Sequence, residues 1–336
     1  MTGLSSPPPE DRVQAFQIET APHRGRLVRL GPVLDQCLER HAYPAPVARV
    51  LGETMVLAAA LAATLKCDGI FTLQLKGAGP VTLVVADVLS DFDEETHERQ
   101  IRGYARFDEA ALANSVEANR DEAPLAALLG EGWLAFTVDQ GPDTERYQGI
   151  VALAGDTLAE CVTHYFRQSE QLPTGLRLAV ARSPEAWRGA ALLLQRMPGS
   201  GGNGTDSYGG DHHNENQPED DGQEAWRRAM ILMATLTPTE LLDPTLNDHD
   251  LLYRLFHQDG VRVFSPEAIH AGCRCSRDRV ATVLRSLGRA EVDASQQNGI
   301  VEVVCEFCST HYGFDQEQVA GLFSQAGPLV ESSSGL

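Results

Sequence analysis

Residues 71–88 read FTLQLKGAGPVTLVVADV, two β-rich runs joined by a short segment that contains Gly77 and Gly79. We expect strands at residues 71–76 and 81–88, with the glycines in the turn between them. Because so short a connection leaves no room for a crossover helix, these strands are predicted to be antiparallel. No helix is predicted directly after the glycines, so they do not indicate a phosphate-binding loop.

Further runs of the same kind lie along the first two thirds of the chain. Strands are predicted at residues 101–107, 133–139, 146–153, 176–181 and 190–195, and helices at residues 45–65, 124–129 and 157–169. The longest apolar stretch, residues 55–65, is about half as long as a membrane-spanning helix and is expected to be buried. The pattern predicts an α+β N-terminal domain at residues 16–198, with a largely antiparallel sheet and packed helices.

The composition changes abruptly at residues 199–223, where the sequence is GSGGNGTDSYGGDHHNENQPEDDGQ. Almost no residue in this tract is apolar, so it is predicted to be a flexible insertion. Its adjacent histidines, His212 and His213, are interpreted as solvated side chains rather than metal ligands. The two ends of the chain, residues 1–15 and 326–336, are expected to be disordered.

Residues 224–264 are predicted to form a helical linker that ends in a short strand at residues 261–264. Thr237, Pro238 and Glu240 form a capping box with proline at the first helical position. Apolar side chains recur at helical spacing, and they are Trp226, Met230, Met233, Leu241, Leu242, Leu251, Leu255 and Phe256. Because the region follows a flexible tract and has no large core of its own, its folding is expected to depend on docking.

A small C-terminal domain is predicted at residues 265–325. Ser265 and Pro266 indicate a helix start, Ser276 can cap a second helix, and strands at residues 300–304 and 312–314 form a hairpin before a last helix capped by Asp315. Four of the seven cysteines lie here, in two close pairs: Cys273, Cys275, Cys305 and Cys308. The other three, Cys37, Cys67 and Cys161, are scattered and are interpreted as small buried hydrophobic residues.

Two cysteine pairs separated by a helix and a strand can converge on one tetrahedral zinc ion. The sulfurs of a Cys-x-Cys pair lie close together, so Cys273 and Cys275 are well placed to form a disulfide once zinc leaves. Arg274 and Arg277 favour thiolate over thiol at this pair, which is a condition for reaction with oxidants. The spacing alone leaves three functions open: a structural zinc site, a redox-switched zinc centre and a zinc-linked nucleic-acid module. An iron–sulfur cluster and a ligand role for His311 are less consistent with it.

Composition narrows the class of protein. The chain has 336 residues, enough for about two domains, and 43% of them are hydrophobic, which is typical of a folded protein. Asp and Glu number 47 against 27 Lys and Arg, so the net charge of −20 disfavours nucleic-acid and membrane partners. The N-terminal sequence contains no apolar run typical of a secretory signal, which predicts a cytoplasmic protein whose cysteines are reduced.

The motifs together resemble one family. CRCSRDRV at residues 273–280 and CEFCSTHYGFD at residues 305–315 are similar to the zinc centre of the heat shock protein 33 family of redox-regulated bacterial chaperones. HAYPAPVARVLGE at residues 41–53, YFRQSEQLPT at residues 165–174 and RLFHQDGVRVF at residues 254–264 resemble the same family in the same order. The resemblance extends from about residue 14 to residue 323.

This resemblance implies a chaperone that holds unfolding proteins under oxidative stress without ATP and is not an enzyme. It implies one zinc ion per chain, bound by the four cysteines in the reduced, inactive state. Oxidation would form disulfides between Cys273 and Cys275 and between Cys305 and Cys308, release the zinc and unfold the linker. The apolar linker residues would then bind clients. The family also implies a homodimer through the N-terminal domain, and the long insertion at residues 199–223 departs from its pattern.

Two functions from other classes compete with this interpretation. A thiol–disulfide oxidoreductase using Cys305 and Cys308 would need a thioredoxin-like βαβ context, which the sequence lacks. A zinc-ribbon nucleic-acid binder would need a basic face. The acidic residues of the chain offset the positive charge of the arginines near the site, which are Arg274, Arg277, Arg279, Arg285 and Arg289. No Gly-x-Ser-x-Gly motif surrounds Ser169, so a hydrolase is not indicated.

Overall fold

The computed structural model of the chain describes residues 10–65, 68–92, 97–115, 123–141, 144–184, 186–197 and 219–324. The chain divides into two compact units, residues 1–271 and residues 272–336. Each unit is described by itself below.

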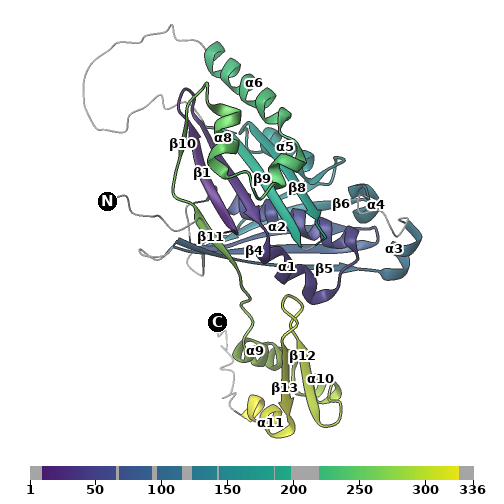
Figure 1. Cartoon of the computed structure of the whole chain (residues 1–336). Coiled ribbons are helices and arrows are strands. Elements are labelled where there is room, and N and C mark those ends of the chain that lie inside the picture. The colour runs from purple at the N-terminus through teal and green to yellow at the C-terminus, as the bar shows by residue number, and fades with distance from the viewer. Residues whose placement is uncertain are drawn as a thin grey trace, which may run out of the picture. The chain divides into compact units, whose positions relative to one another are not determined.

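Unit 1 is built on an eleven-stranded sheet (Figure 1). Its strands are β1 (Arg12–Ile18), β2 (His23–Leu30), β3 (Gly69–Gly77), β4 (Val81–Phe92), β5 (His97–Phe107), β6 (Gly132–Asp139), β7 (Tyr147–Ala152), β8 (Thr174–Arg182), β9 (Trp187–Arg196), β10 (Val261–Val263) and β11 (Glu267–Ala271). They are ordered β7-β6-β3-β4-β5-β11-β1-β2-β9-β8, with β10 paired to β1. In the described chain every pairing of this sheet is antiparallel except that of β11 with β5. The predicted α+β class is confirmed.

The first helices of unit 1 pack around one central helix. They are α1 (Pro32–Leu38), the 3-10 turn η1 (Glu39–His41), α2 (Ala45–Ala62), α3 (Glu109–Ser115), α4 (Leu125–Leu129) and α5 (Leu158–Gln168). Within the described residues α2 is the one helix long and apolar enough to cross a membrane, but most of its side chains are buried inside the unit. Leu51, Met55 and Leu57 are fully covered. It is therefore the core helix that the apolar run at residues 55–65 predicts.

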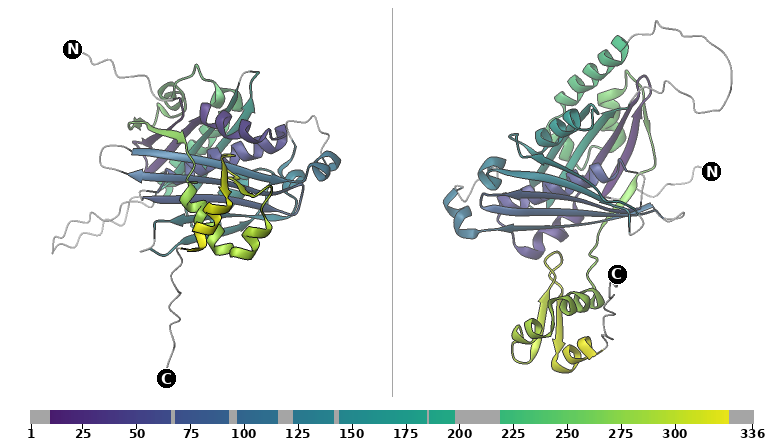
Figure 2. Two further views of the ribbon diagram at one scale, coloured as in Figure 1. Left: turned by 90° about the horizontal axis from the view of Figure 1, so that it is seen from below. Right: turned by 180° about the vertical axis from the view of Figure 1, so that it is seen from behind.

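The β1-β2-β9-β8 half of the sheet is covered on both faces. Because side chains alternate along a strand, Ala191 and Leu193 of β9 pack in the core around α2, whereas Leu192 and Leu194 face the opposite side. That side is covered by three helices, α6 (Glu219–Thr235), α7 (Pro238–Leu242) and α8 (Asp248–Phe256) (Figures 1 and 2). We call the apolar cluster between these helices and the strands the linker core.

Local signals determine where two of these helices begin. Thr237 and Glu240 form the predicted capping box, in which the Thr237 hydroxyl accepts from the Glu240 backbone N–H and the Glu240 carboxylate accepts from the Thr237 N–H. Asn247 caps α8 through the Asp250 backbone N–H. After α8, β10 pairs with β1 where a short strand is predicted.

Three boundaries differ from the sequence-based expectation. Order begins before residue 16, because β1 starts at Arg12 and the Asp11 carboxylate accepts backbone N–H groups of Gly31 and Val33. Helix α6 starts at Glu219, inside the predicted insertion; the rest of that tract, including His212 and His213, lies outside the described residues. Residues 267–271 form β11 of the large sheet instead of the helix expected after Pro266, because β1 and β5 offer backbone partners on both sides. Residues 1–9 and the tail at residues 326–336 also lie outside the description.

Unit 2 contains three helices and one hairpin in its described part. They are α9 (Arg277–Leu287), α10 (Arg289–Ala294), β12 (Ile300–Val304), β13 (His311–Asp315) and α11 (Gln316–Ser324). The predicted caps are confirmed: the Ser276 hydroxyl accepts the Arg279 N–H and the Asp315 carboxylate accepts the Gln318 N–H. The fully buried core is small: Ala281, Leu284, Val292, Val301, Phe314 and Val319. So small a core supplies little stability, so a bound metal would matter to this fold.

Candidate metal centre

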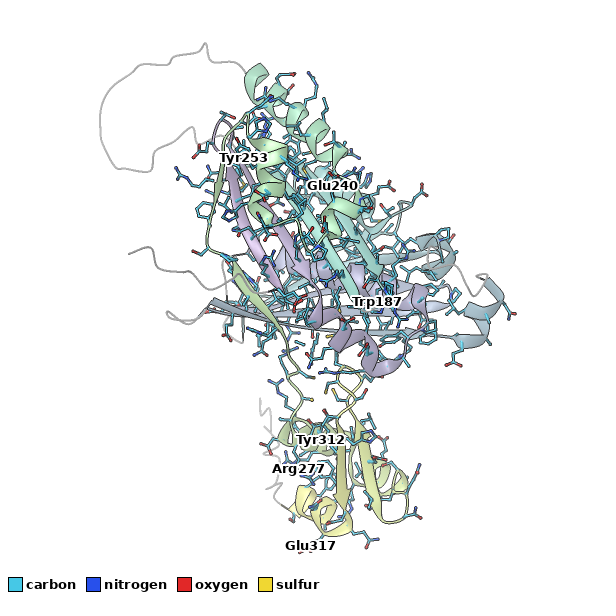
Figure 3. All side chains as sticks on the ribbon, in the orientation of Figure 1. Trp187, Glu240, Tyr253, Arg277, Tyr312 and Glu317 are labelled. Atoms are coloured by element: carbon cyan, nitrogen blue, oxygen red, sulfur yellow. The ribbon has the colours of Figure 1, made fainter. Side chains whose placement is uncertain are left out.

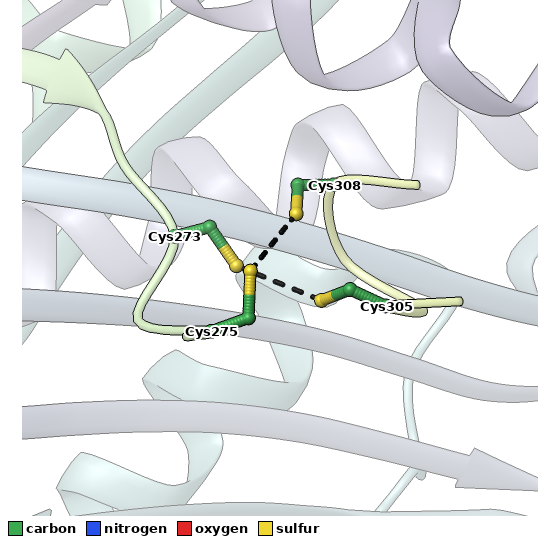
Figure 4. Close-up of side chains that lie close together, drawn as sticks. All are labelled: Cys273, Cys275, Cys305 and Cys308. Carbon is green, nitrogen blue, oxygen red and sulfur yellow. Dashed lines mark hydrogen bonds between the residues drawn. The ribbon is translucent and has the colours of Figure 1, made fainter. Parts of the chain in front are cut away.

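The four cysteines of the C-terminal pairs come together in unit 2 (Figure 4). Cys273 and Cys275 lie in the segment just before α9, and Cys305 and Cys308 lie in the turn of the β12–β13 hairpin. All four sulfurs lie within 4.8 Å of one another. The Sγ atoms of Cys273 and Cys305 are 3.7 Å apart, and those of Cys275 and Cys308 are 3.3 Å apart.

Backbone geometry turns both hairpin sulfurs to the same side. The Cys305 N–H donates to the Thr310 carbonyl at 2.9 Å, and the Ser309 N–H donates to the Cys305 carbonyl at 2.8 Å. Ser309 adopts a positive φ of 55°, which closes the turn directly after Cys308. On the other side of the cluster, the Ser276 cap starts α9 directly after Cys275 and limits where that cysteine can lie.

The donor set fits a soft metal ion. Four thiolates around tetrahedral zinc, at a zinc–sulfur distance of about 2.3 Å, would be about 3.8 Å apart. The separations of 3.7 Å and 3.3 Å are close to this value, so a metal would require only a small expansion. His311 is not part of this cluster, whose ligand atoms all come from the four cysteines; its Nδ1 lies 2.7 Å from a Glu302 carboxylate oxygen. Among the described residues, the four cysteines are the one cluster with metal-ligand geometry.

As thiols, Cys275, Cys305 and Cys308 differ in acidity. Burial and neighbouring thiols raise the pKa of Cys275 to about 12, against a hydrogen bond of 3.1 Å that the Tyr312 hydroxyl donates to its sulfur. Burial also raises the pKa of Cys305. For Cys308, burial is outweighed by contacts that favour the thiolate, first the Thr310 hydroxyl at 3.1 Å, and its pKa is lowered to about 6. The metal-free cluster therefore carries a thiolate at neutral pH.

Arg277, the first residue of α9, has other contacts than the sequence led us to expect. Arg277, which is labelled in Figure 3, donates to the Gly313 carbonyl and to the Gln318 side chain, and its guanidinium lies 4.2 Å from the centre of the Phe314 ring. Its partners join α9 to the hairpin and α11, and no cysteine sulfur is among them. The prediction that Arg277 favours the thiolate form is therefore not supported by its contacts.

Comparison with known proteins gives one result across the chain. The family model described as "Hsp33 protein" matches residues 11–315. The chain belongs to the Hsp33 family. Proteins named 33 kDa chaperonin from Caulobacter vibrioides and Ectopseudomonas mendocina are 40% and 39% identical to it; the matches cover 91% and 96% of this chain and 95% and 99% of theirs.

A solved structure agrees with the fold. The crystal structure of the 33 kDa chaperonin (Hsp33 homologue) from Thermotoga maritima superposes with a TM-score of 0.71. The match covers 93% of this chain and 97% of that one at 24% sequence identity. At this identity the likeness supports the Hsp33 architecture and no finer feature.

In this Hsp33 chain the candidate client residues of the linker are gathered and covered. Five of them are buried: Met233, Leu241, Leu251, Leu255 and Phe256. Trp226, Met230 and Leu242 are partly buried against the same linker core. The rings of Phe256 and Phe16 stack with their centres 5.9 Å apart. All eight residues thus contribute to one interface with the sheet.

Polar contacts that the sequence analysis missed hold the same helices. Asp248 of α8, 5% exposed, forms ion pairs with Arg12 of β1 at 2.6 Å and with Arg29 of β2 at 2.9 Å. Arg29 also donates to the Asp243 carbonyl at 2.5 Å. Arg177 of β8 donates to the carbonyls of Met233, Ala234 and Leu236 at the end of α6. In the sequence, the only indication of these contacts is that arginines occur within otherwise apolar strands. This pattern does not identify the groups to which the arginines bind.

The remaining singled-out residues lie away from the metal centre. Cys37 and Cys161 are buried thiols, as expected, and Cys67 lies outside the described residues. Glu170 of the QSEQ motif accepts hydrogen bonds from the hydroxyls of Tyr147 and Tyr165, at 2.6 Å and 2.5 Å. It therefore joins the end of α5 to β7 through side chains.

Proposed function

We propose that this chain is a redox-regulated, ATP-independent chaperone that binds unfolding proteins in the cytoplasm during oxidative stress. Membership of the Hsp33 family and the chaperonin names of its relatives support a chaperone. The observation that carries the redox part is the cluster of four cysteine sulfurs within 4.8 Å, in a unit whose described part has only six buried core side chains. A chaperone of this kind holds its client stoichiometrically and needs no catalytic residues.

Cys273, Cys275, Cys305 and Cys308 would hold one zinc ion in the reduced protein. When bound, zinc supplies a structural staple that keeps four thiolates together, and in small zinc modules it contributes roughly 10–16 kcal/mol to folding. The Tyr312 and Thr310 hydroxyls contact the sulfurs of Cys275 and Cys308 and orient them. Loss of the metal is then expected to unfold unit 2.

Oxidation is the proposed trigger. Two thiolates give two electrons to one peroxide molecule, a disulfide forms between the sulfurs, and the peroxide leaves as two hydroxide ions. Two such reactions would join Cys273 to Cys275 and Cys305 to Cys308. Because all four sulfurs lie within one cluster, proximity does not select the pairing, and this choice rests on the family resemblance and on the closeness of each pair in sequence.

Release of the linker would then expose the client surface. The eight apolar residues of α6, α7 and α8 are covered by strands β1, β2, β8 and β9 in the linker core. Once the helices leave the sheet, both surfaces of that interface become available, and flexible methionines such as Met230 and Met233 adapt to many shapes. We propose unfolding proteins and a second copy of the chain as the partners of the active form, with neither nucleic acid nor membrane involved.

The test is light scattering from a thermally unfolding client, with a metallochromic dye reporting zinc. The reduced protein is expected to leave aggregation unchanged, and the peroxide-treated protein to suppress it as one zinc per chain is released. Cys273→Ser should lose zinc and the response to peroxide, whereas Cys161→Ala, a thiol outside the cluster, should retain both. Equal scattering with reduced and oxidised protein would reject redox regulation, and catalytic turnover with a dithiol would favour an oxidoreductase.

A further inference from the structure

His23, the first residue of β2, is completely buried beneath the linker helices. Its ring lies edge-on against that of Trp226 on α6, with the ring centres 5.2 Å apart. Neither Nδ1 nor Nε2 makes a hydrogen bond of good geometry in the described part of the chain, although the backbone of Pro22 and Ala225 lies near enough to favour a proton on the ring. A buried imidazole without a well-formed hydrogen bond is costly even when neutral, and this one lies under a helix that is proposed to move.

The charged groups around His23 do little to favour a proton on the ring. Its cross-strand partner on β9 is Arg196, whose positive charge opposes protonation. Asp259, just after α8, favours protonation, but its carboxylate is already bound to Arg228 of α6. From α6 the ring meets the apolar Trp226, and its neighbour on β1 is Ile18, which carries no charge.

Protonation would therefore favour the open state of this interface. Burial, together with the charge of Arg196, outweighs the Pro22 backbone and Asp259 and lowers the pKa of His23 below its usual value of about 6.5. When α6 leaves the sheet, the ring meets water and recovers its usual affinity for a proton. The undocked state thus binds more protons than the docked state, and docking weakens as the pH falls below about 6.5.

We propose that His23 is a proton-sensitive contact under α6, through which mild acid loosens the linker without oxidation of any cysteine. A proton from solvent binds to the free ring nitrogen, and the resulting imidazolium can be solvated only if α6 moves away. Trp226, one of the candidate client residues, is thereby uncovered. The inference rests on the proposed function in treating the docked linker as the inactive state, but the proton-linked release itself requires only the docked structure.

The experiment uses the reduced, zinc-loaded full chain. Hydrogen–deuterium exchange of residues 219–235 is measured at pH 7.5 and at pH 5.5 for the wild type and for His23→Phe, under conditions in which the opening equilibrium sets the rate. The ratio of wild-type to variant exchange cancels the intrinsic effect of pH. It is expected to increase by up to about tenfold between the two pH values, since one proton is taken up on opening over about one pH unit below 6.5.

Two controls make the result specific. His249→Gln removes an exposed histidine of α8, so its exchange is expected to follow the wild type at both pH values. Zinc content is followed in every sample, because loss of metal in acid would affect wild type and His23→Phe alike. His23→Gln provides a second variant that cannot titrate, in case the phenylalanine disturbs folding.

An unchanged exchange ratio would overturn the inference, as would an NMR titration in which the His23 ring of the folded protein takes up its proton at or above pH 6.5. The NMR measurement needs no variant and therefore stands even if both substitutions disturb folding. None of these measurements uses a client protein. A chain whose α6 responds to acid through His23 but never suppresses aggregation would retain this inference and lose the proposed chaperone function.

Discussion

Replacing Asp248 by asparagine is expected to loosen the linker helices of the reduced protein. Asp248 is the first residue of α8, and its carboxylate is 5% exposed between the guanidinium groups of Arg12 and Arg29, which are 11% and 10% exposed. Asparagine keeps the shape of the side chain but removes the buried negative charge that both guanidinium groups share. Removing one partner from a buried ion pair costs about 3–5 kcal/mol. The opening equilibrium of α8 should therefore increase roughly a hundredfold to several thousandfold.

Hydrogen exchange of residues 238–263 in the reduced, zinc-loaded protein measures this opening. Exchange of α2 should change much less, because its core lies on the other face of the sheet. Asp250→Asn is the matched control: it removes an exposed carboxylate from the first turn of the same helix but keeps an oxygen that can accept from the Asn247 amide, so it should change opening by no more than about 1 kcal/mol. If the proposed function holds, the reduced Asp248→Asn protein should also suppress client aggregation in proportion to its opening.

The reasoning would be refuted if Asp248→Asn and Asp250→Asn gave the same exchange rates. A triple replacement, Arg12→Met with Arg29→Met and Asp248→Leu, separates the cost of an unpaired charge from the worth of the pair itself. Because well-packed apolar residues often replace a buried ion pair without loss, the triple variant should recover most of the protection lost in Asp248→Asn. No recovery would mean that these side chains act through something other than charge.

Three further outcomes are expected. Zinc affinity should increase at least about a hundredfold per pH unit between pH 6.5 and 7.5, because Cys275 and Cys305, whose pKa values are raised, must each lose a proton to bind metal. Competition with a chromophoric chelator measures the affinity. An increase below tenfold would contradict the raised pKa values of these two thiols. Glu53 of α2 pairs with Arg49 at 3.1 Å, but burial outweighs this pair and raises the pKa of Glu53. The folded protein then binds this proton more tightly than the unfolded chain, so it loses stability as the pH rises from about 4.3 through the raised pKa. Glu53→Gln should therefore raise the melting temperature at pH 7, and this gain should vanish at pH 4. Arg177→Met keeps most of the aliphatic stem but removes the donor to the Met233, Ala234 and Leu236 carbonyls. Hydrogen exchange at the end of α6 should become faster by the equivalent of about 1.5–3 kcal/mol, the range for hydrogen bonds to a charged group. An unchanged exchange rate would show that these carbonyls find other partners.

Features encoded within a few neighbouring residues were predictable from the sequence. The β3–β4 hairpin, the Thr237 capping box and the Ser276 cap depend on local spacing, and each is found in the structure. The four cysteines were predictable as a cluster because only a few side chains offer soft ligands. In each case the interacting groups are close in sequence or chemically rare.

Features that depend on distant partners were not predictable. Strands β1 and β2 contain charged residues that obscure the alternation typical of a strand. The ion-pair partner of Arg12 is Asp248, which is 236 residues away in the sequence. Residues 267–271 carry a local helix signal, yet β1 and β5 supply backbone partners that make them a strand. Such contacts follow from the topology of the whole sheet, which no local window contains.

The linker core contains polar groups as well as apolar ones. Asp248 of α8 pairs with Arg12 and Arg29 on the strands, and the buried ring of His23 lies under α6. The core around α2 also contains a buried charge, Arg99, which pairs with Glu267. An interface closed entirely by apolar residues would be more stable. A helix that leaves the sheet in the active state would do so more readily from a less stable interface. Charged groups also recover favourable hydration when they separate. This hydration lowers the free energy of opening without exposing additional apolar surface. If the proposed function holds, the polar groups would set how readily the linker leaves the sheet, and the eight apolar residues would contact the client.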